Sequence, residues 1–474
     1  MKTPEGRSRP SAKRETRAPH ALDTDAQHTQ PPRAGRPARD AAVAAVRAVR
    51  IEGQTLDAAL AANATRNNLD PRDRAFAHLI AATVLRRWGS LGHIIEAHLP
   101  RGWPPKSGPL RETLAVAAAQ MTLLGVSPYA AIDIAVAQTA THRRMSPFKG
   151  LANAVLRRVS ESGVDQLAAV DAVAADVPDW LLARWAGHYG AEAARALGAA
   201  ALAPAPLVLR PRDPNTAADL AAALGGALLP TGSVAVDAGG VVSEKPGYGD
   251  GTWWVQDAAA SLPALLIEAP RGARVLDLCA APGGKTLQLA ARGYDVTAVD
   301  QSKKRMSRVE ENLARCNLTA ELVTADIMAW EPEVPADAIL LDAPCSATGT
   351  MRRHPDMLHN RTAADLLRLV PTQEALLARA IDWLKPGGAL IYCTCSLEPE
   401  EGAQQIARLL ASRDDVQISP IRPMKQALQD HAAPDADTIP ASFVVEDGTL
   451  RTRPTDWPEF GGIDGFYAAR LVRT

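Results

Sequence analysis

The spacing of apolar residues changes along the chain and divides it into regions. Residues 1–38 are rich in Pro, Arg, Ser and Thr and hold almost no large apolar side chain. Such a composition cannot bury enough surface to fold by itself. We therefore predict a disordered, mildly basic tail, whose simplest interpretation is a solvated extension and whose alternative is weak attraction to a phosphate backbone.

Residues 39–170 follow the spacing of helices. Asp70 is a good N-cap and Pro71 suits the first helical position. The apolar residues that follow them recur with a period near 3.6, at Phe76, Leu79, Ile80, Val84 and Trp88. Residues 109–125 and 148–160 behave similarly, and no strand-like alternation interrupts them. This region is predicted to be an all-α domain.

Two arginine pairs, Arg86–Arg87 and Arg157–Arg158, are expected to close helices of this domain. Positive charge complements the carboxyl end of a helix. The same charges would also suit a surface that faces RNA, and the sequence leaves both interpretations open.

Residues 171–250 mix short helical and strand-like runs. Helices are expected in residues 177–190 and 216–226, and strands in residues 205–212 and 232–242. A small α+β connecting module is the simplest arrangement of these elements.

Residues 251–474 alternate buried strands with amphipathic helices. The expected strands are "ARVLDLCA", "DVTAVD", "ELVTAD", "DAILLDAP" and "GALIYCTCS". Helices lie between them, one capped by Ser302. This order predicts an α/β, Rossmann-like domain with a doubly wound parallel sheet covered on both faces, so the chain is multidomain.

Composition limits which partners and which cellular compartment the sequence predicts. The 474 residues carry a net charge of -1, so contacts with nucleic acid must rest on local patches. The five cysteines, an odd number, favour reduced thiols in a cytoplasmic protein. The first residues lack the apolar core of a secretory signal, and no apolar run approaches the roughly 20 residues that span a bilayer. We expect a soluble monomer with no membrane contact.

Polar residues gather where the predicted strands end, which is where ligands bind in such sheets. "DLCAAPGGKT", Asp277–Thr286, lets a ligand approach the backbone at Gly283 and Gly284, yet it matches neither dinucleotide nor phosphate-loop signatures. Asp300 is placed to accept ribose hydroxyls, and Asp326 an adenine amino group. A lone aspartate is more often a cap, but three strand-end acids beside one glycine-rich loop favour a nucleotide-like ligand without a pyrophosphate.

Two later strands end in cysteines. Pro344 keeps Cys345 out of regular strand pairing, so that its thiol can face the cleft. Cys393 and Cys395 point to the same face, but only Cys395 is near enough to the strand end to reach the cleft. Cys393 is interpreted as a packed small side chain. A metal site is disfavoured, because these cysteines lack tetrahedral ligand spacing.

These motifs resemble a known family. "DLCAAPGGKT", "VDQS", "LLDAPCSATGT", "LKPGGALIYCTCSLEPEEG" and "DGFYAARL" are similar to the RNA cytosine-5 methyltransferases that use S-adenosyl-L-methionine. The helical domain is similar to the antiterminator NusB, which implies an RNA-binding role. The resemblance covers about residues 40–474. It implies that the substrate is RNA, most directly 16S ribosomal RNA of the small subunit.

The resemblance also implies roles for single residues. The methionine end of the cofactor would be cradled by Cys279, Ala280, Ala281, Pro282, Gly283, Gly284 and Lys285. Asp300 would hold its ribose and Asp326 its adenine, while Asp342 borders cofactor and target base. Cys395 would be the nucleophile, and Cys345 would assist product release. Ser261 stands where the resemblance predicts glutamine, although Gln256 and Asp257 match.

The chemistry of cytosine explains this set. A thiolate that adds to C6 turns C5 into a carbon nucleophile. Positive charge near the thiol would favour the thiolate, and Lys285 and the cofactor sulfonium are both candidates. A protonated Asp342 could donate to cytosine N3.

Contacts with the RNA are expected beside the target base, which must be unpaired or flipped. Arg352, Arg353 and His354 are candidates for phosphate contacts. Trp253 and Trp254 could stack on bases or pack in the core.

Two rivals stay open at this point. One keeps the chemistry but changes the substrate to transfer RNA or another ribosomal site. The other is a non-catalytic RNA-binding or assembly protein, against which the presence of both Cys345 and Cys395 argues, because binding alone needs neither thiol.

Overall fold

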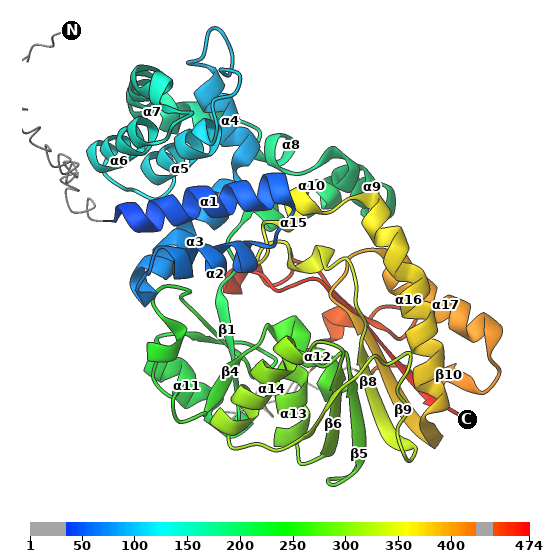
Figure 1. Cartoon of the computed structure of the whole chain (residues 1–474). Helices are drawn as coiled ribbons and strands as arrows, with labels where there is room; N and C mark the ends of the chain where they lie inside the picture. Colours follow the sequence, from blue (N-terminus) through cyan, green and yellow to red (C-terminus); the bar gives the residue numbers. More distant parts are fainter. Residues whose placement is uncertain (1–34, 423–438) are drawn as a thin grey trace, which may run out of the picture.

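The computed structural model describes residues 35–422 and 439–474. It holds a helical N-terminal domain, a small middle sheet and a C-terminal domain built on a larger sheet (Figure 1). Most of the predicted tail lies outside the described residues. Its predicted end at residue 38 was too late, because helix α1 already begins at Arg36.

The N-terminal domain is entirely helical over the described residues, as predicted. Its helices are α1 (Arg36–Glu52), α2 (Leu56–Arg66), α3 (Pro71–Arg86), α4 (Trp88–Glu96), α5 (Leu110–Thr122), α6 (Pro128–Thr141) and α7 (Lys149–Ala169). Asp70 caps α3 by accepting from the Asp73 backbone N–H at 2.7 Å, so the predicted start is confirmed. Ile80 and Val84 are fully buried, but Leu79 is 48% exposed. Ile80 and Val84 are four residues apart and therefore face the core on the same side of α3, whereas Leu79 is the neighbour of Ile80 and points about 100° away around the helix.

The arginine pairs differ from each other in placement. Arg86 ends α3 and donates to the backbone O of Arg352 at 2.7 Å. Arg87 donates to the buried carboxylate of Asp176 at 3.1 Å. Arg157 and Arg158 lie inside α7 rather than at its end, so the prediction that they close a helix was wrong.

The middle region begins with α8 (Ala172–Asp176), α9 (Asp179–Tyr189) and α10 (Ala191–Leu202). A small antiparallel sheet follows in the order β2-β3-β1-β4, formed by β1 (Leu207–Pro211), β2 (Ala227–Leu228), β3 (Val234–Val236) and β4 (Trp253–Val255), with helix α11 (Ala217–Leu224). Strand β4 therefore extends the small sheet past residue 250. Trp253 and Trp254 are 0% and 2% exposed, which confirms core packing and removes both from RNA stacking.

The larger sheet has the order β10-β12-β9-β8-β5-β6-β7, with β11 paired to β12. Its strands are β5 (Arg274–Leu278), β6 (Asp295–Asp300), β7 (Glu321–Thr324), β8 (Ala336–Asp342), β9 (Leu384–Thr394), β10 (Val416–Ile418), β11 (Leu450–Thr452) and β12 (Phe466–Arg473). Strands β9, β8, β5, β6 and β7 run parallel, as predicted. The prediction of a purely parallel sheet was wrong at one side, where β12 runs antiparallel to β9 and β10.

Helices cover both faces of this sheet (Figure 1). They are α12 (Ala258–Leu265), α13 (Gly284–Ala291), α14 (Lys303–Arg315), α16 (Ala363–Asp382) and α17 (Ala403–Ser412), whereas the short helix α15 (Met357–Asn360) lies beside α1 of the helical domain. Successive residues of β9 pack on opposite faces: Cys393 joins the core beneath α12, whereas Tyr392 joins the core beneath α16. Cys393 is fully buried, so its interpretation as a packed side chain is confirmed, and Cys395 lies against the same core.

Among the described residues, no helix has both the length and the apolar character that crossing a membrane requires.

Candidate active site

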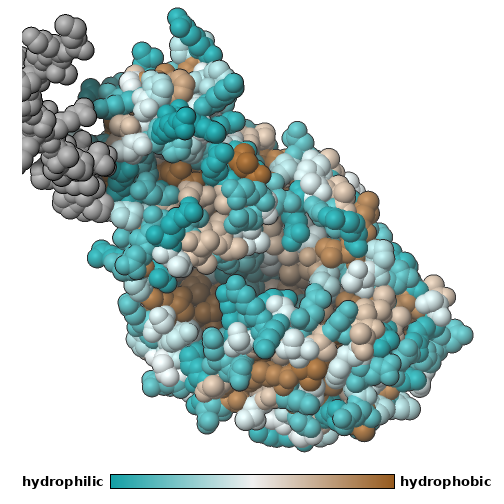
Figure 2. Space-filling model, in the orientation of Figure 1, coloured by the Kyte–Doolittle hydropathy of each residue, from teal (hydrophilic) through white to brown (hydrophobic). Residues whose placement is uncertain are grey.

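The carboxyl ends of the parallel strands enclose a cavity of about 260 Å³. Seven site residues singled out from the sequence line it together: Cys279, Ala281, Asp300, Asp326, Asp342, Cys345 and Cys395. Arg305 also contributes to its wall. On a larger scale, the surface is hollowed between the helical domain and the domain of the larger sheet (Figure 2).

The glycine-rich loop forms one side of the cavity. Gly283 has a φ of 102°, and a Cβ on it would meet Val309 Cγ1 at 2.9 Å, so only glycine fits. Thr286 Oγ1 donates to Asp277 Oδ2 at 2.6 Å and ties the two ends of the loop together. Burial raises the pKa of Asp277 to about 7. The loop is therefore fixed from behind, with Cys279 and Ala281 facing the cavity.

Two strand-end carboxylates form the opposite part of the wall. Asp300 accepts from the backbone N–H groups of Ala281 at 3.2 Å and Ser302 at 2.9 Å, and Arg305 lies 3.2 Å from it. Asp326 accepts from the Met328 backbone N–H at 2.9 Å. A carboxylate offers about four acceptor positions, so each retains capacity for ligand hydroxyl or amino groups. This donor-poor, acceptor-rich wall fits the ribose and adenine of S-adenosyl-L-methionine.

Lys285 and Asp342 form an ion pair behind the thiols. Lys285 Nζ donates to Asp342 Oδ2 at 2.8 Å, and the lysine side chain is only 9% exposed. Burial by itself lowers the pKa of Lys285, but Asp342, Cys393 and Asp277 together outweigh burial and the net shift is upward. Both Asp342 oxygens have a partner, because Oδ2 accepts from Lys285 Nζ and Oδ1 from Cys393 Sγ. Donation from Asp342 to cytosine N3 stays a prediction.

The two thiols of the cleft touch. Cys345 Sγ lies 3.5 Å from Cys395 Sγ, although the residues are fifty positions apart. The hydrogen bond to Cys395, then burial, raises the pKa of the Cys345 thiol well above its ordinary value. Cys393 instead donates to Asp342 Oδ1 at 3.6 Å. Cys345 and Cys395 line the cavity and Cys393 does not, in agreement with the prediction that only the first two face the cleft.

The arginines that follow the Cys345 loop do not present free guanidinium groups as expected, because Arg352 is buried and the half-buried Arg353 is paired with two carboxylates. Arg353 donates to Asp257 Oδ2 at 2.5 Å and to Asp464 Oδ2 at 2.8 Å, joining helix α12 to the segment before β12. Arg352 is 2% exposed and donates to the backbone O of Gly461. Their predicted phosphate contacts were therefore wrong, because burial commits both guanidinium groups to internal partners. His354 is exposed, and its contact with RNA stays a prediction.

The remaining sequence-predicted residues take supporting positions. Ser261 is fully buried and its backbone O accepts from Gln288 Nε2 at 3.0 Å. Gln256 Nε2 reaches the same Gln288 side chain at 3.1 Å. Ala280, Pro282, Gly283, Gly284 and Lys285 belong to the loop but do not line the cavity. The segment around Ser261 thus packs behind the glycine-rich loop.

Family models match two parts of the chain. Residues 264–472 match the model described as 16S rRNA methyltransferase RsmB/F. Residues 36–161 match the NusB family. The matched ranges correspond to the sheet domain with the cavity and to the helical domain.

Curated relatives match almost the whole chain. The ribosomal RNA small subunit methyltransferase B of Xylella fastidiosa (strain Temecula1) is 37% identical and covers 89% of this chain and 94% of its own length. The protein of the same name from Sodalis glossinidius is 33% identical over 91% of this chain and 96% of its own.

Solved structures share the fold. The crystal structure of PH0851 is 20% identical, with a TM-score of 0.67, covering 92% of this chain and 99% of that one. A methyltransferase homolog from Pyrococcus horikoshii is 26% identical, with a TM-score of 0.50, covering 65% of this chain and 96% of that one. Fold, motifs and relatives agree over both domains, and the chain belongs to the family of the ribosomal RNA small subunit methyltransferases B.

Proposed function

We propose that this protein, an S-adenosyl-L-methionine-dependent ribosomal RNA methyltransferase by family, methylates C5 of a cytosine in 16S ribosomal RNA through a transient bond between Cys395 and C6. The observation that carries this proposal is the contact of two thiols, at 3.5 Å, in the cavity that also holds Asp300 and Asp326. Binding RNA requires neither thiol, whereas addition to a pyrimidine ring and its reversal give each of them a task.

The residues of the cavity divide the work. Cys279 and Ala281 of the glycine-rich loop, with Asp300 and Asp326, would hold S-adenosyl-L-methionine, and the rest of loop 279–285 would support them from behind. When bound, the cofactor supplies an electrophilic methyl group. Cys395 Sγ adds to C6 and shifts the C5=C6 electron pair to C5. Lys285 anchors Asp342 between the loop and the thiols, at 2.8 Å, so that the carboxylate faces the cavity from a fixed position.

Of the two positive charges that the sequence suggests for stabilising the Cys395 thiolate, the structure favours only one. Lys285 interacts with Asp342 and with Cys393, and neither contact is to Cys395. The sulfonium of the cofactor is therefore the candidate we favour. Thiolate formation would then depend on a bound cofactor, which orders the reaction with cofactor first.

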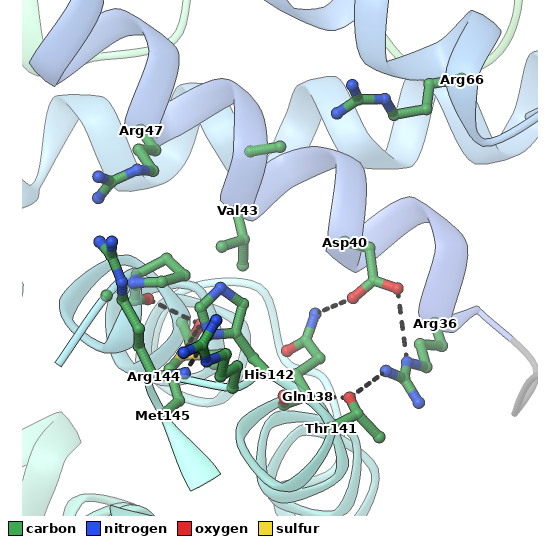
Figure 3. A pocket seen from close by; sticks show the side chains of 15 residues that line it. Arg36, Asp40, Val43, Arg47, Arg66, Gln138, Thr141, His142, Arg144 and Met145 are labelled. Atoms are coloured by element: carbon green, nitrogen blue, oxygen red, sulfur yellow. Dashed lines mark hydrogen bonds and ion pairs between the residues drawn. The ribbon is translucent and has the colours of Figure 1, made fainter.

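The helical domain offers a place for the RNA backbone. A cavity of about 680 Å³ there is lined by five arginines, Arg36, Arg47, Arg66, Arg143 and Arg144 (Figure 3). Arg36 lies 3.4 Å from Asp40, and Arg47 lies 3.5 Å from Glu112. The other three have no acidic partner among the described residues. We propose that Arg66, Arg143 and Arg144 contact phosphates of RNA nucleotides away from the target cytosine. Such contacts would position the RNA without reading its sequence.

Methyl transfer to a 16S ribosomal RNA transcript, followed by bisulfite sequencing, tests the proposal. We expect one cytosine to become resistant to conversion. Cys395→Ala should lower the rate at least about 100-fold, because the addition step is lost. Cys393→Ala is the matched control, since that cysteine is buried on the same strand and should leave the rate within a few fold. Methylation at a position other than cytosine C5, or an active Cys395→Ala protein, would contradict the proposal.

A further inference from the structure

Glu401 is a buried carboxylate that the mechanism so far leaves without a task. It lies six residues beyond Cys395, in the short turn before α17, and is 0% exposed. The Ser346 backbone N–H donates to it at 2.9 Å and Gln373 Nε2 at 3.0 Å, and the Ser346 hydroxyl also donates. No arginine or lysine pairs with this carboxylate in the described part of the chain. A buried charge without a counter-ion is costly, so a purely structural link would favour a neutral side chain.

The hydrogen bonds of Glu401 connect the two segments that carry the thiols. Ser346 directly follows Cys345, whereas Glu401 belongs to the segment that begins with Cys395. A second link lies beside it, where Ser346 Oγ is 3.2 Å from Ser396 Oγ. Gln373 Nε2 also donates to the backbone O of Pro344 at 2.9 Å. The residues on both sides of Cys345 are thus held relative to Cys395, with Glu401 at the centre.

Glu401 affects Cys345 in two ways: it fixes the position of the Cys345 loop, and its negative charge raises the pKa of the Cys345 thiol. The charged and titratable groups that face Cys345 are Cys395, Glu401, Asp342 and Tyr392. The hydrogen bond to Cys395 and burial raise the pKa of Cys345 most, and the negative charges of Glu401 and Asp342 raise it further. Cys345 is therefore kept as a neutral thiol that can donate its proton.

We propose that Glu401 is a positioning residue for product release: it holds Cys345 against Cys395 so that the Cys345 S–H donates a hydrogen bond to the Cys395 sulfur as that sulfur leaves the base. This inference rests on the proposed function. In this proposal Glu401, which does not itself react, connects the loop of Cys345 to the segment of Cys395.

The release step balances as an elimination. The C5 proton passes to water, and the C5–H electron pair forms the new C5=C6 double bond. The C6–S bond breaks, and its electron pair leaves on Cys395 Sγ as a thiolate. The Cys345 S–H stabilises that thiolate by a hydrogen bond, across the 3.5 Å that separates the two sulfur atoms. No oxidant or reductant is needed.

Glu401→Gln tests the inference, because it removes the charge while keeping one oxygen for the Ser346 N–H. We expect methyl transfer to slow by about tenfold, which corresponds to weakening one hydrogen bond to a charged group. The covalent protein–RNA adduct should accumulate, seen as a slower band on denaturing gels with 16S ribosomal RNA. Glu398→Gln is the matched control: Glu398 is equally buried in the same segment, but its side chain accepts from Arg184 at 2.8 Å and Trp185 Nε1 at 3.1 Å rather than from Ser346. It should show no accumulation.

A pH profile separates positioning from mere stability. Removing a negative charge next to Cys345 lowers the pKa of its thiol. Release by Glu401→Gln should therefore begin to fall at lower pH than in the native protein. Glu401→Asp keeps the charge but not the reach, so its adduct should accumulate without that shift. If Glu401→Gln does not fold, Glu401→Asp still supplies the adduct measurement.

Four results would overturn either the inference or the proposed function on which it rests. Native release by Glu401→Gln would refute it, as would equal adduct levels in Glu401→Gln and Glu398→Gln. If Cys345→Ala traps an adduct and Glu401→Gln does not, the inference fails while the proposed function stands. If the native protein methylates no cytosine, the proposed function itself fails.

Discussion

Replacing Arg353 by methionine should destabilise the protein strongly. The guanidinium lies between Asp257 and Asp464, whose side chains are 5% and 4% exposed. Removing one partner from a buried ion pair costs about 3–5 kcal/mol, because it leaves charge uncompensated. Here two carboxylates lose one shared partner, so the upper half of that range applies. At roughly 2 °C per kcal/mol for a domain of this size, the unfolding midpoint should fall by about 8 °C or more.

The deficit should depend on pH. Burial raises the pKa of Asp464 to about 6, although Arg353 opposes the shift, and its loss would raise that pKa further. A raised folded-state pKa adds stability that is fully present below the unfolded value, near 3.9, and is lost as pH rises through the folded value. The Arg353→Met protein should therefore be closest to the native protein near pH 5 and furthest from it at pH 8.

Differential scanning fluorimetry from pH 5 to pH 8 measures both effects. Arg368→Met is the control, because that side chain is 76% exposed and its pair with Asp365 contributes little. An Arg353→Met midpoint equal to that of Arg368→Met would refute the reasoning. If the Arg353→Met protein were stable but bound RNA more weakly and with a smaller salt dependence, the result would support the phosphate contact of Arg353 that the sequence suggested.

Three further outcomes follow from the site and the helical domain. Lys285→Met leaves Asp342 unpaired and should lower methyl transfer by about 100-fold at unchanged helix content by circular dichroism; full activity would exclude Lys285 from the site. Asp326→Ala should weaken S-adenosyl-L-methionine binding by about three- to tenfold in calorimetry, the loss of one hydrogen bond, and unchanged affinity would remove Asp326 from the cofactor pocket. Arg143→Ala with Arg144→Ala should reduce the salt slope of RNA binding by about 2, and an unchanged slope would remove the arginine cavity from the RNA path.

Local rules anticipated much of this fold. Asp70 and Ser302 cap their helices because short-range hydrogen bonds fix both positions. The strand-end acids and the Cys345–Cys395 pair meet because parallel strands end at one edge of the sheet. The antiparallel strand β12 escaped prediction, since an apolar run such as "FYAARLVR" does not state the direction of its partner.

One residue that the sequence misassigned and one that it missed share a cause. Arg353 and Glu401 carry charge in polar, turn-like segments, which typically lie at the surface, yet distant chain buries Glu401 fully and leaves Arg353 only 23% exposed. Arg353 is buried by Asp257 and Asp464, and Glu401 by the Cys345 loop. Helical spacing likewise placed Leu79 in the core because it cannot resolve how wide the buried face is. Only the tertiary structure supplies these partners.

The covalent intermediate is the central claim, and the Cys345→Ala variant tests it most directly. Cys345 touches the sulfur that must leave the base, so its removal should stall release without preventing attack. Incubated with 16S ribosomal RNA and S-adenosyl-L-methionine, Cys345→Ala should form a denaturation-resistant protein–RNA adduct that disappears in the Cys345→Ala, Cys395→Ala double variant. Methylation by Cys345→Ala with native turnover and no adduct, or an adduct that persists without Cys395, would contradict the account.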